Sequence, residues 1–129
     1  MPTPLRVAII GCGAVAPAHF ESFTRCPDVQ IAWACDLVET KARALAGRFG
    51  EPSTTTDYRQ AVTDPTVDCV SICTDHASHA PIAVAALEAG KHVLCEKALA
   101  ASREGLDAML AAHARRPELV FGGVFQHRF

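Results

Sequence analysis

The feature that most constrains this chain is an apolar run that ends in a glycine-rich turn. Residues 6–10 read as a buried strand, and Gly11, Cys12 and Gly13 follow directly. Gly11 allows a tight turn, and Gly13 lets the backbone approach a ligand closely because it has no Cβ. Ala16 takes a third small position, where a helix must pack close to the strand. This strand, turn and helix pattern predicts the start of an α/β sheet.

The same turn predicts a phosphate site. A helix expected from near Ala14 would direct its unpaired N–H groups and the positive end of its dipole at an anion. The backbone of residues 11–15, which are Gly11, Cys12, Gly13, Ala14 and Val15, would then hold a pyrophosphate without a lysine. We therefore expect a dinucleotide-binding site at this turn.

Asp36 supports this prediction, because it closes the next apolar run 20 residues after Ala16. That spacing presents a carboxylate to a ribose diol. Such a carboxylate favours NAD, since it would repel the 2′-phosphate of NADP. Lys41 and Arg43 follow shortly and leave NADP open as the less favoured cofactor. The alternative interpretation of Asp36 is a solvated loop acid.

Strand-like and helical runs alternate along the whole chain, which is typical of a parallel sheet covered on both faces. Strands are expected at residues 6–10, 30–35, 53–55, 68–73, 92–95 and 119–125. Six strands in this rhythm predict one α/β, doubly wound parallel sheet, a Rossmann fold with strand order 3-2-1-4-5-6. Its carboxyl-terminal strand ends would bring Gly11, Thr74 and Lys97 to one rim.

Two later helices have recognisable ends. Ser78 is a candidate N-cap for a helix that carries Pro81 in its first turn and stops at Gly90. Ser102 is a candidate N-cap for the last helix. Four side chains of that helix fall on one face and are expected to contact the core, namely Leu106, Met109, Leu110 and His113.

Charge and hydropathy narrow the possible partners and location. The formal net charge is −2, and half of the residues are apolar. Nucleic acid and anionic membranes are therefore not expected as partners. There is no apolar stretch of about 18 residues, and the first strand begins too early to leave room for a signal peptide. A cytoplasmic protein is expected.

The chain has six cysteines, but their spacing does not indicate a metal site, because it contains no CxxC pair. Four of them lie in expected strands and should behave as small apolar side chains, namely Cys35, Cys69, Cys73 and Cys95. Cys12 has two possible interpretations. The helix dipole could lower the pKa of its thiol, or the residue could simply fill the turn.

Five segments together resemble the N-terminal domain of the Gfo/Idh/MocA oxidoreductases. They are VAIIGCGAVAPAH at 7–19, ACD at 34–36, ICTDHASH at 72–79, ALEAGKHVLCEKALA at 86–100 and GVFQHRF at 123–129. The resemblance spans nearly the whole chain, and AGKHVLCEK is its most specific part. It implies oxidation or reduction of a hydroxyl or keto carbon, usually on a sugar, cyclitol or related polyol, with NAD or NADP.

The resemblance also implies roles for individual residues. The family's Glu-Lys-Pro motif corresponds to Glu96, Lys97 and Ala98, with alanine in place of proline. Lys97 is the implied catalytic residue, near the nicotinamide and the substrate hydroxyl, where it would orient the hydroxyl and accept or relay its proton. Glu96 is expected to position or pair with another group.

The motif after the fourth expected strand adds Thr74 and His79 to the cofactor crevice. His79, like His19 near the glycine turn, is expected to be structural rather than catalytic. Asp75 stands where the family often has proline. It either adds a carboxylate to the crevice or is merely exposed to solvent.

The chain is short for a two-domain enzyme. Residues 1–129 are expected to form the dinucleotide-binding domain, with the family's C-terminal substrate domain absent. Such a chain should bind cofactor with little turnover, and its uncovered surface could lead to a homo-oligomer. The alternative is a non-catalytic dinucleotide-binding sensor or assembly module. A methyltransferase using S-adenosylmethionine is weaker, because it does not account for Glu96 and Lys97.

Overall fold

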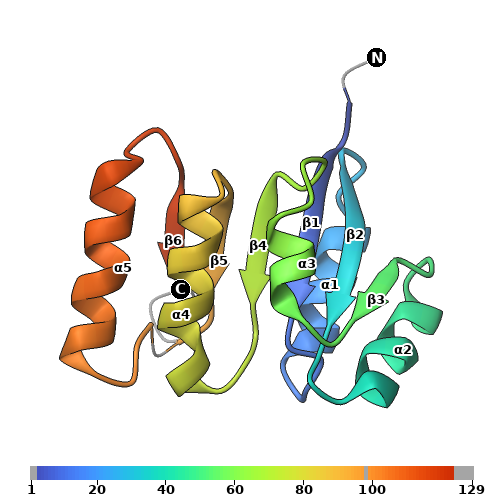
Figure 1. The fold of residues 1–129 in the computed structure, drawn as a ribbon. Helices are drawn as coiled ribbons and strands as arrows, with labels where there is room; N and C mark the ends of the chain where they lie inside the picture. Colours follow the sequence, from blue (N-terminus) through green and yellow to red (C-terminus); the bar gives the residue numbers. More distant parts are fainter. Residues whose placement is uncertain (1–2, 98, 124–129) are drawn as a thin grey trace.

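The computed structural model describes residues 3–97 and 99–123. Six parallel strands form one sheet in the order β3-β2-β1-β4-β5-β6 (Figure 1). This arrangement confirms the expected doubly wound fold. The strands are β1 (Leu5–Ile10), β2 (Val29–Cys35), β3 (Ser53–Thr55), β4 (Cys69–Ile72), β5 (His92–Cys95) and β6 (Phe121–Gly123).

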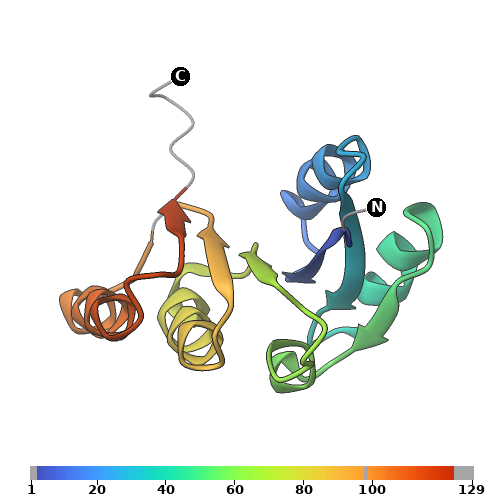
Figure 2. The same ribbon diagram turned by 90° about the horizontal axis from the view of Figure 1, so that it is seen from above.

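Helices cover the sheet from both sides. Helices α1 (Ala16–Thr24) and α2 (Glu39–Arg48) lie on one face, and α3 (Tyr58–Val62), α4 (His76–Glu88) and α5 (Arg103–Arg115) lie on the other (Figure 2). Because alternate strand residues point to opposite faces, β1 serves two cores. Val7 and Ile9 pack with α1 and α2, whereas Ala8 and Ile10 pack with α3, α4 and α5. Burial on both faces explains why the strands read as nearly continuous apolar runs.

Four strands differ from their expected bounds: β1 and β2 each begin one residue earlier, β4 is shorter, and β6 begins later. Strand β4 ends at Ile72, so Cys73 lies one residue beyond it and not inside it. Strand β6 begins only at Phe121, although Leu119 before it is buried. The imidazole of His113 bonds the Leu119 carbonyl instead, at 2.8 Å, and Val120 N donates to His92 Nδ1 at 2.9 Å. Residues 124 and 125 lie outside the described residues.

The expected cap of α4 was wrong, whereas that of α5 is confirmed. Ser102 Oγ accepts from Gly105 N at 3.0 Å. Helix α4, however, begins at His76 with Asp75 as its N-cap. Ser78 therefore lies in the first turn, where its hydroxyl donates to Asp75 Oδ1 at 2.7 Å. Pro81 consequently lies inside the helix and not in its first turn.

The core-facing stripe of α5 is narrower than expected. Met109 and Ala112 are buried, but Leu110 is 53% exposed. Leu110 was therefore wrongly assigned to the core: α5 packs mainly against α4, and Leu110 lies on the exposed side of the helix.

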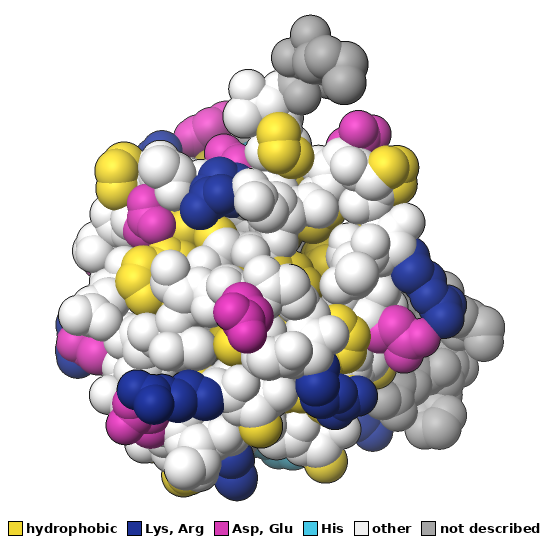
Figure 3. Space-filling view, turned by 90° about the vertical axis from the view of Figure 1, so that its right-hand side faces the viewer, with side chains coloured by type: hydrophobic (Ala, Val, Ile, Leu, Met, Phe, Trp, Pro, Cys, Tyr) yellow, Lys and Arg dark blue, Asp and Glu magenta, His cyan; other side chains and the backbone are white. Residues whose placement is uncertain are grey.

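The surface beside β3 and α2 carries side chains of both charges, interspersed with apolar ones (Figure 3). This mixture agrees with the small formal net charge of −2. Among the described residues, no helix combines the length and apolar character needed to cross a membrane.

Candidate functional site

The glycine turn is held at the meeting point of three strands. Gly11 has φ +98°, and its N–H donates to the Cys35 carbonyl at 2.7 Å. A Cβ at this position would lie 2.7 Å from the backbone carbonyl of Cys73 and 2.8 Å from Thr74 N. Gly11 is therefore required both by its backbone conformation and by the close approach of the chain after β4.

Gly13 lies in a different environment, although it is only two residues away. A Cβ there would meet no atom within 4 Å among the described residues. Helix α1 begins at Ala16, two residues later than the sequence predicts, and its N-cap residue, Val15, makes no side-chain cap bond. Within the helix, Ala16 N and Ala18 N already donate to the carbonyls of Gly13 and Val15, at 3.3 and 3.2 Å. Pro17 has no N–H. An anion would therefore be bound by the turn before α1, through the N–H groups of residues 13–15.

Both carboxylate oxygens of Asp36 accept from backbone N–H groups, one of them in the glycine turn and the other in the loop after β2. Oδ2 accepts from Cys12 N at 2.8 Å, and Oδ1 accepts from Val38 N at 2.8 Å. The carboxylate thus joins the end of β2 to the glycine turn and is not a loose loop acid. Each oxygen can accept a further hydrogen bond, so the group stays available to a diol.

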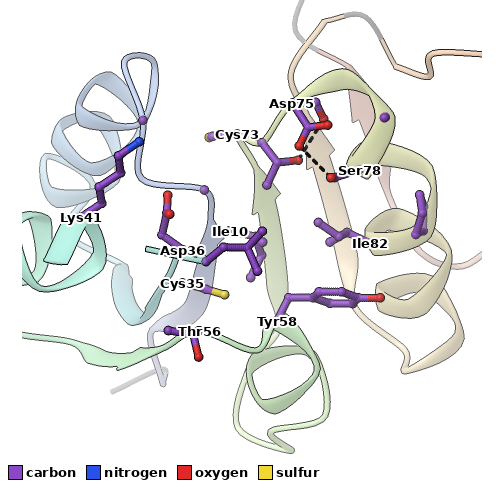
Figure 4. Close-up of a pocket in the computed structure, with 16 residues that line it drawn as sticks. Ile10, Cys35, Asp36, Lys41, Thr56, Tyr58, Cys73, Asp75, Ser78 and Ile82 are labelled. Carbon is purple, nitrogen blue, oxygen red and sulfur yellow. Dashed lines mark hydrogen bonds between the residues drawn. The ribbon is translucent and has the colours of Figure 1, made fainter. Parts of the chain in front are cut away.

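A pocket of about 430 Å³ opens over the carboxyl ends of β1, β2 and β4. Figure 4 shows Asp36 and Lys41 on one side, and Asp75 and Ser78 on the other. Further lining comes from residues that sequence reasoning missed, among them Leu37, Thr56, Tyr58, Pro81 and Ile82. No local motif marks them, because loops and helices far apart in sequence bring them together.

The motif after β4 contributes unequally to this pocket. Thr74 lines it, and so does Asp75, which is also exposed. The hydrogen bond from Ser78 holds the pKa of Asp75 below its ordinary value. His79 is completely buried, and its Nε2 lies 3.0 Å from the Thr74 carbonyl. Since a carbonyl only accepts, Nε2 donates, and this bond holds the backbone of Thr74, which lines the pocket.

Glu96 and Lys97 lie beyond this pocket, at the carboxyl end of β5. Glu96 is 6% exposed, and its Oε1 lies 2.6 Å from His19 Nε2. Lys97 is exposed and borders a separate open hollow. Of the three residues expected on one rim, Gly11 and Thr74 share the pocket, whereas Lys97 lies on the neighbouring strand end.

The thiol of Cys12 is buried, which supports the second of its two interpretations, a residue that fills the turn. Burial raises the pKa of this thiol to about 12, with a further contribution from the Asp36 charge. Cys12 therefore contributes its backbone N–H to Asp36, and its side chain fills the turn. Within residues 3–97 and 99–123, no three His, Cys, Asp or Glu side chains gather as metal ligands.

Comparison with known proteins identifies the family. Residues 5–124 match GFO_IDH_MocA, described as an oxidoreductase family with an NAD-binding Rossmann fold. The chain belongs to this family.

Individual relatives agree with the family match. D-glucoside 3-dehydrogenase from Escherichia coli K12 is 37% identical over 98% of this chain and 36% of that enzyme. A crystal structure of myo-inositol 2-dehydrogenase from Lactobacillus plantarum, 27% identical, superposes with a TM-score of 0.91 and covers 98% of this chain and 38% of that one.

GenD2 from gentamicin A biosynthesis, solved in complex with NAD, is 36% identical with a TM-score of 0.86. The match covers 95% of this chain and 35% of GenD2. The chain thus spans little more than a third of the length of these relatives.

Proposed function

We propose that this chain is the dinucleotide-binding domain of an oxidoreductase acting on a hydroxyl or keto carbon of a sugar, cyclitol or related polyol. The observation that carries the proposal is the Asp36 carboxylate, held by Cys12 N at the mouth of a pocket that the glycine turn also lines. The substrate class is supported by relatives that are named as glucoside and inositol dehydrogenases.

The geometry supports a role for each part of the groove. The turn of residues 11–15 would hold the pyrophosphate through the N–H groups of residues 13–15, because those of Gly11 and Cys12 already donate within the fold. Asp36 would accept from the adenosine ribose. The pocket beside Tyr58 has the volume and apolar lining to receive the adenine. The second nucleotide half would lie over the ends of β4 and β5, near Thr74 and Glu96. When bound, the dinucleotide supplies hydride acceptance and donation.

Lys97 is proposed as the catalytic residue of this chain. Its exposed ammonium, beside the nicotinamide half of the groove, would orient a substrate hydroxyl and take up or return its proton. The remaining substrate contacts would come from a second domain, so residues 1–129 alone should bind cofactor with little turnover.

The proposal predicts a preference for NAD⁺ over NADP⁺. Lys41 is the one cation in the described pocket lining, whereas the Arg43 guanidinium is paired with Glu39 at 2.6 Å. The Asp36 charge should repel a 2′-phosphate, so calorimetric titration should give NAD⁺ a Kd lower by about tenfold or more. Tighter binding of NADP⁺ would contradict the assignment.

Two variants test whether the charge of Asp36 sets the preference between the two cofactors. Asp36→Asn loses the charge and one of the two bonds to backbone N–H groups, because an amide nitrogen cannot accept. The lost bond affects both cofactors alike, so the loss of charge should move the ratio of the two Kd values toward one. Asp28→Asn is the control, because Asp28 lies at the opposite end of the sheet, where its carbonyl accepts from Leu5 N. It should leave both Kd values unchanged.

A further inference from the structure

Three largely buried polar side chains, from α1, from β4 and from the residue after β5, form a hydrogen-bonded chain beside the groove. His19 of α1 lies between Ser71 of β4 and Glu96, which directly follows β5. His19 Nδ1 is 2.9 Å from Ser71 Oγ, and His19 Nε2 is 2.6 Å from Glu96 Oε1. Ser71 is fully buried, and the side chains of His19 and Glu96 are only 10% and 8% exposed.

The chemistry of these groups determines which nitrogen of His19 carries a proton. A carboxylate can only accept, so His19 Nε2 carries hydrogen and donates to Glu96. Nδ1 then accepts from the Ser71 hydroxyl when the ring is neutral, or donates to that oxygen when the ring is protonated. In both states the bond to Glu96 persists. Such a bond is needed, because a carboxylate this buried is costly without a donor.

The backbone of Glu96 is fixed as firmly as its side chain. Glu96 N donates to the Ile72 carbonyl at 3.0 Å, which extends the β4–β5 ladder by one residue. Glu96 is thus held by β4 through its backbone and by α1 through its carboxylate. Lys97 follows it directly and leaves the sheet from this fixed point.

We propose that His19 and Ser71 make Glu96 a positioning residue for the nicotinamide half of the groove. The inference rests on the proposed function. Helix α1 starts at the glycine turn, where the pyrophosphate would bind, and His19 lies one turn into it. The hydrogen-bonded chain therefore ties the strand end that carries Lys97 to the helix that follows the turn that would hold the phosphates.

Calorimetry with two ligands tests this role on the 129-residue chain. ADP-ribose has every part of NAD⁺ except the nicotinamide ring. The wild type should bind NAD⁺ more tightly than ADP-ribose. His19→Leu should leave the Kd of ADP-ribose unchanged and raise that of NAD⁺ about fivefold, the value of one net hydrogen bond. His19→Gln should restore NAD⁺ binding, because its amide can donate to Glu96.

Further variants control for the effect of a new leucine on α1 and for misfolding of His19→Leu. Ser22→Leu places the same side chain at an exposed position of α1 and should change neither Kd. Glu96→Gln preserves shape, so it should weaken NAD⁺ selectively, by a smaller factor, even if His19→Leu fails to fold. Because His19 and Glu96 act as one unit, the double variant His19→Leu/Glu96→Leu should lose no more NAD⁺ affinity than His19→Leu alone.

The outcomes separate this inference from the proposed function. If both ligands bind but every variant weakens them equally, or none weakens NAD⁺, the positioning role is refuted and cofactor binding stands. Equal affinity of the wild type for NAD⁺ and ADP-ribose refutes it as well. If the wild type binds neither ligand, the proposed function fails and this inference fails with it.

Discussion

At the scale of single residues, the two glycines of the turn serve different purposes. Gly11 has a left-handed backbone and no room for a Cβ, because the chain after β4 passes within 2.7 Å of that position. Gly13 has open space around it. The fold therefore requires Gly11, whereas only a ligand would require Gly13 to lack a side chain.

This difference yields a paired prediction. Gly11→Ala should lower the free energy of unfolding by about 3 kcal/mol, since it combines backbone strain with a steric clash. Gly13→Ala should change it by less than about 0.5 kcal/mol but weaken NAD⁺ binding, because the methyl group would occupy the approach of the pyrophosphate. Urea unfolding and calorimetry measure the two effects separately.

A third glycine provides the control for this pair. Gly47 lies in the last turn of α2, and an added Cβ would have no neighbour within 4 Å among the described residues. Gly47→Ala should therefore raise stability by about 0.5–1 kcal/mol, through helix propensity, without affecting NAD⁺. Unchanged NAD⁺ binding in Gly13→Ala would remove this residue from the candidate site.

The sequence predicted the roles of single residues only where their partners are near in sequence. The glycine turn and Asp36 are close in sequence, and their spacing predicts where both lie in a strand, turn and helix unit. This local pattern was therefore enough to predict the position of the pocket. The bond between His19 and Glu96 spans 77 positions and depends on how α1 packs against the sheet. The raised pKa of Cys12 likewise results from burial, which no local pattern displays.

At the scale of elements, the sequence located the strands better than the ends of helices. Alternating apolar runs and right-handed crossovers leave few possible strand orders, and the expected one was confirmed. The start of α4 was misjudged because Asp75 and Ser78, three residues apart, are both good caps. In the structure Asp75 has the extended backbone of an N-cap, and the Ser78 hydroxyl bonds its carboxylate from the first turn.

Lys91 connects two elements at the other end of the sheet. It is 6% exposed, and its Nζ donates to the carbonyls of Asp64 and Val67 at 2.8 and 2.7 Å. The ammonium thus fastens the turn after α3 to the start of β5. Both carbonyls would lose this donor if the ammonium were removed.

Lys91→Met should therefore lower the free energy of unfolding by about 2–3 kcal/mol, measured by urea unfolding. Methionine retains the apolar stem of the side chain, so the loss reports on the hydrogen bonds. Lys41→Met makes the same change at an exposed position and should cost less than about 0.5 kcal/mol. Equal effects of the two substitutions would show that the Lys91 bonds do not stabilise the fold.

At the scale of the whole molecule, two cores on opposite faces of the sheet include five of the six cysteines. They are small enough to fit between strands and helices in closely packed layers. Burial raises the pKa of Cys12, Cys35, Cys73 and Cys95 to about 12 and that of Cys69 to about 11. Their protonation therefore couples to folding across both cores.

This coupling predicts a loss of stability in alkali. In the unfolded chain a cysteine titrates at about 8.5, so between pH 9 and about 11 the unfolded state releases protons that the folded state keeps. The free energy of unfolding should then fall by about 1.4 kcal/mol per pH unit for each buried thiol. Urea unfolding at a series of pH values measures the slope of this free energy against pH.

Two variants test whether the core thiols cause the slope. Cys35→Ala should make it shallower by the contribution of one thiol, about 1.4 kcal/mol per pH unit. Cys26→Ala removes an exposed thiol and should leave the slope as in the wild type. A slope that is the same in all three proteins would mean that the core thiols do not contribute to it.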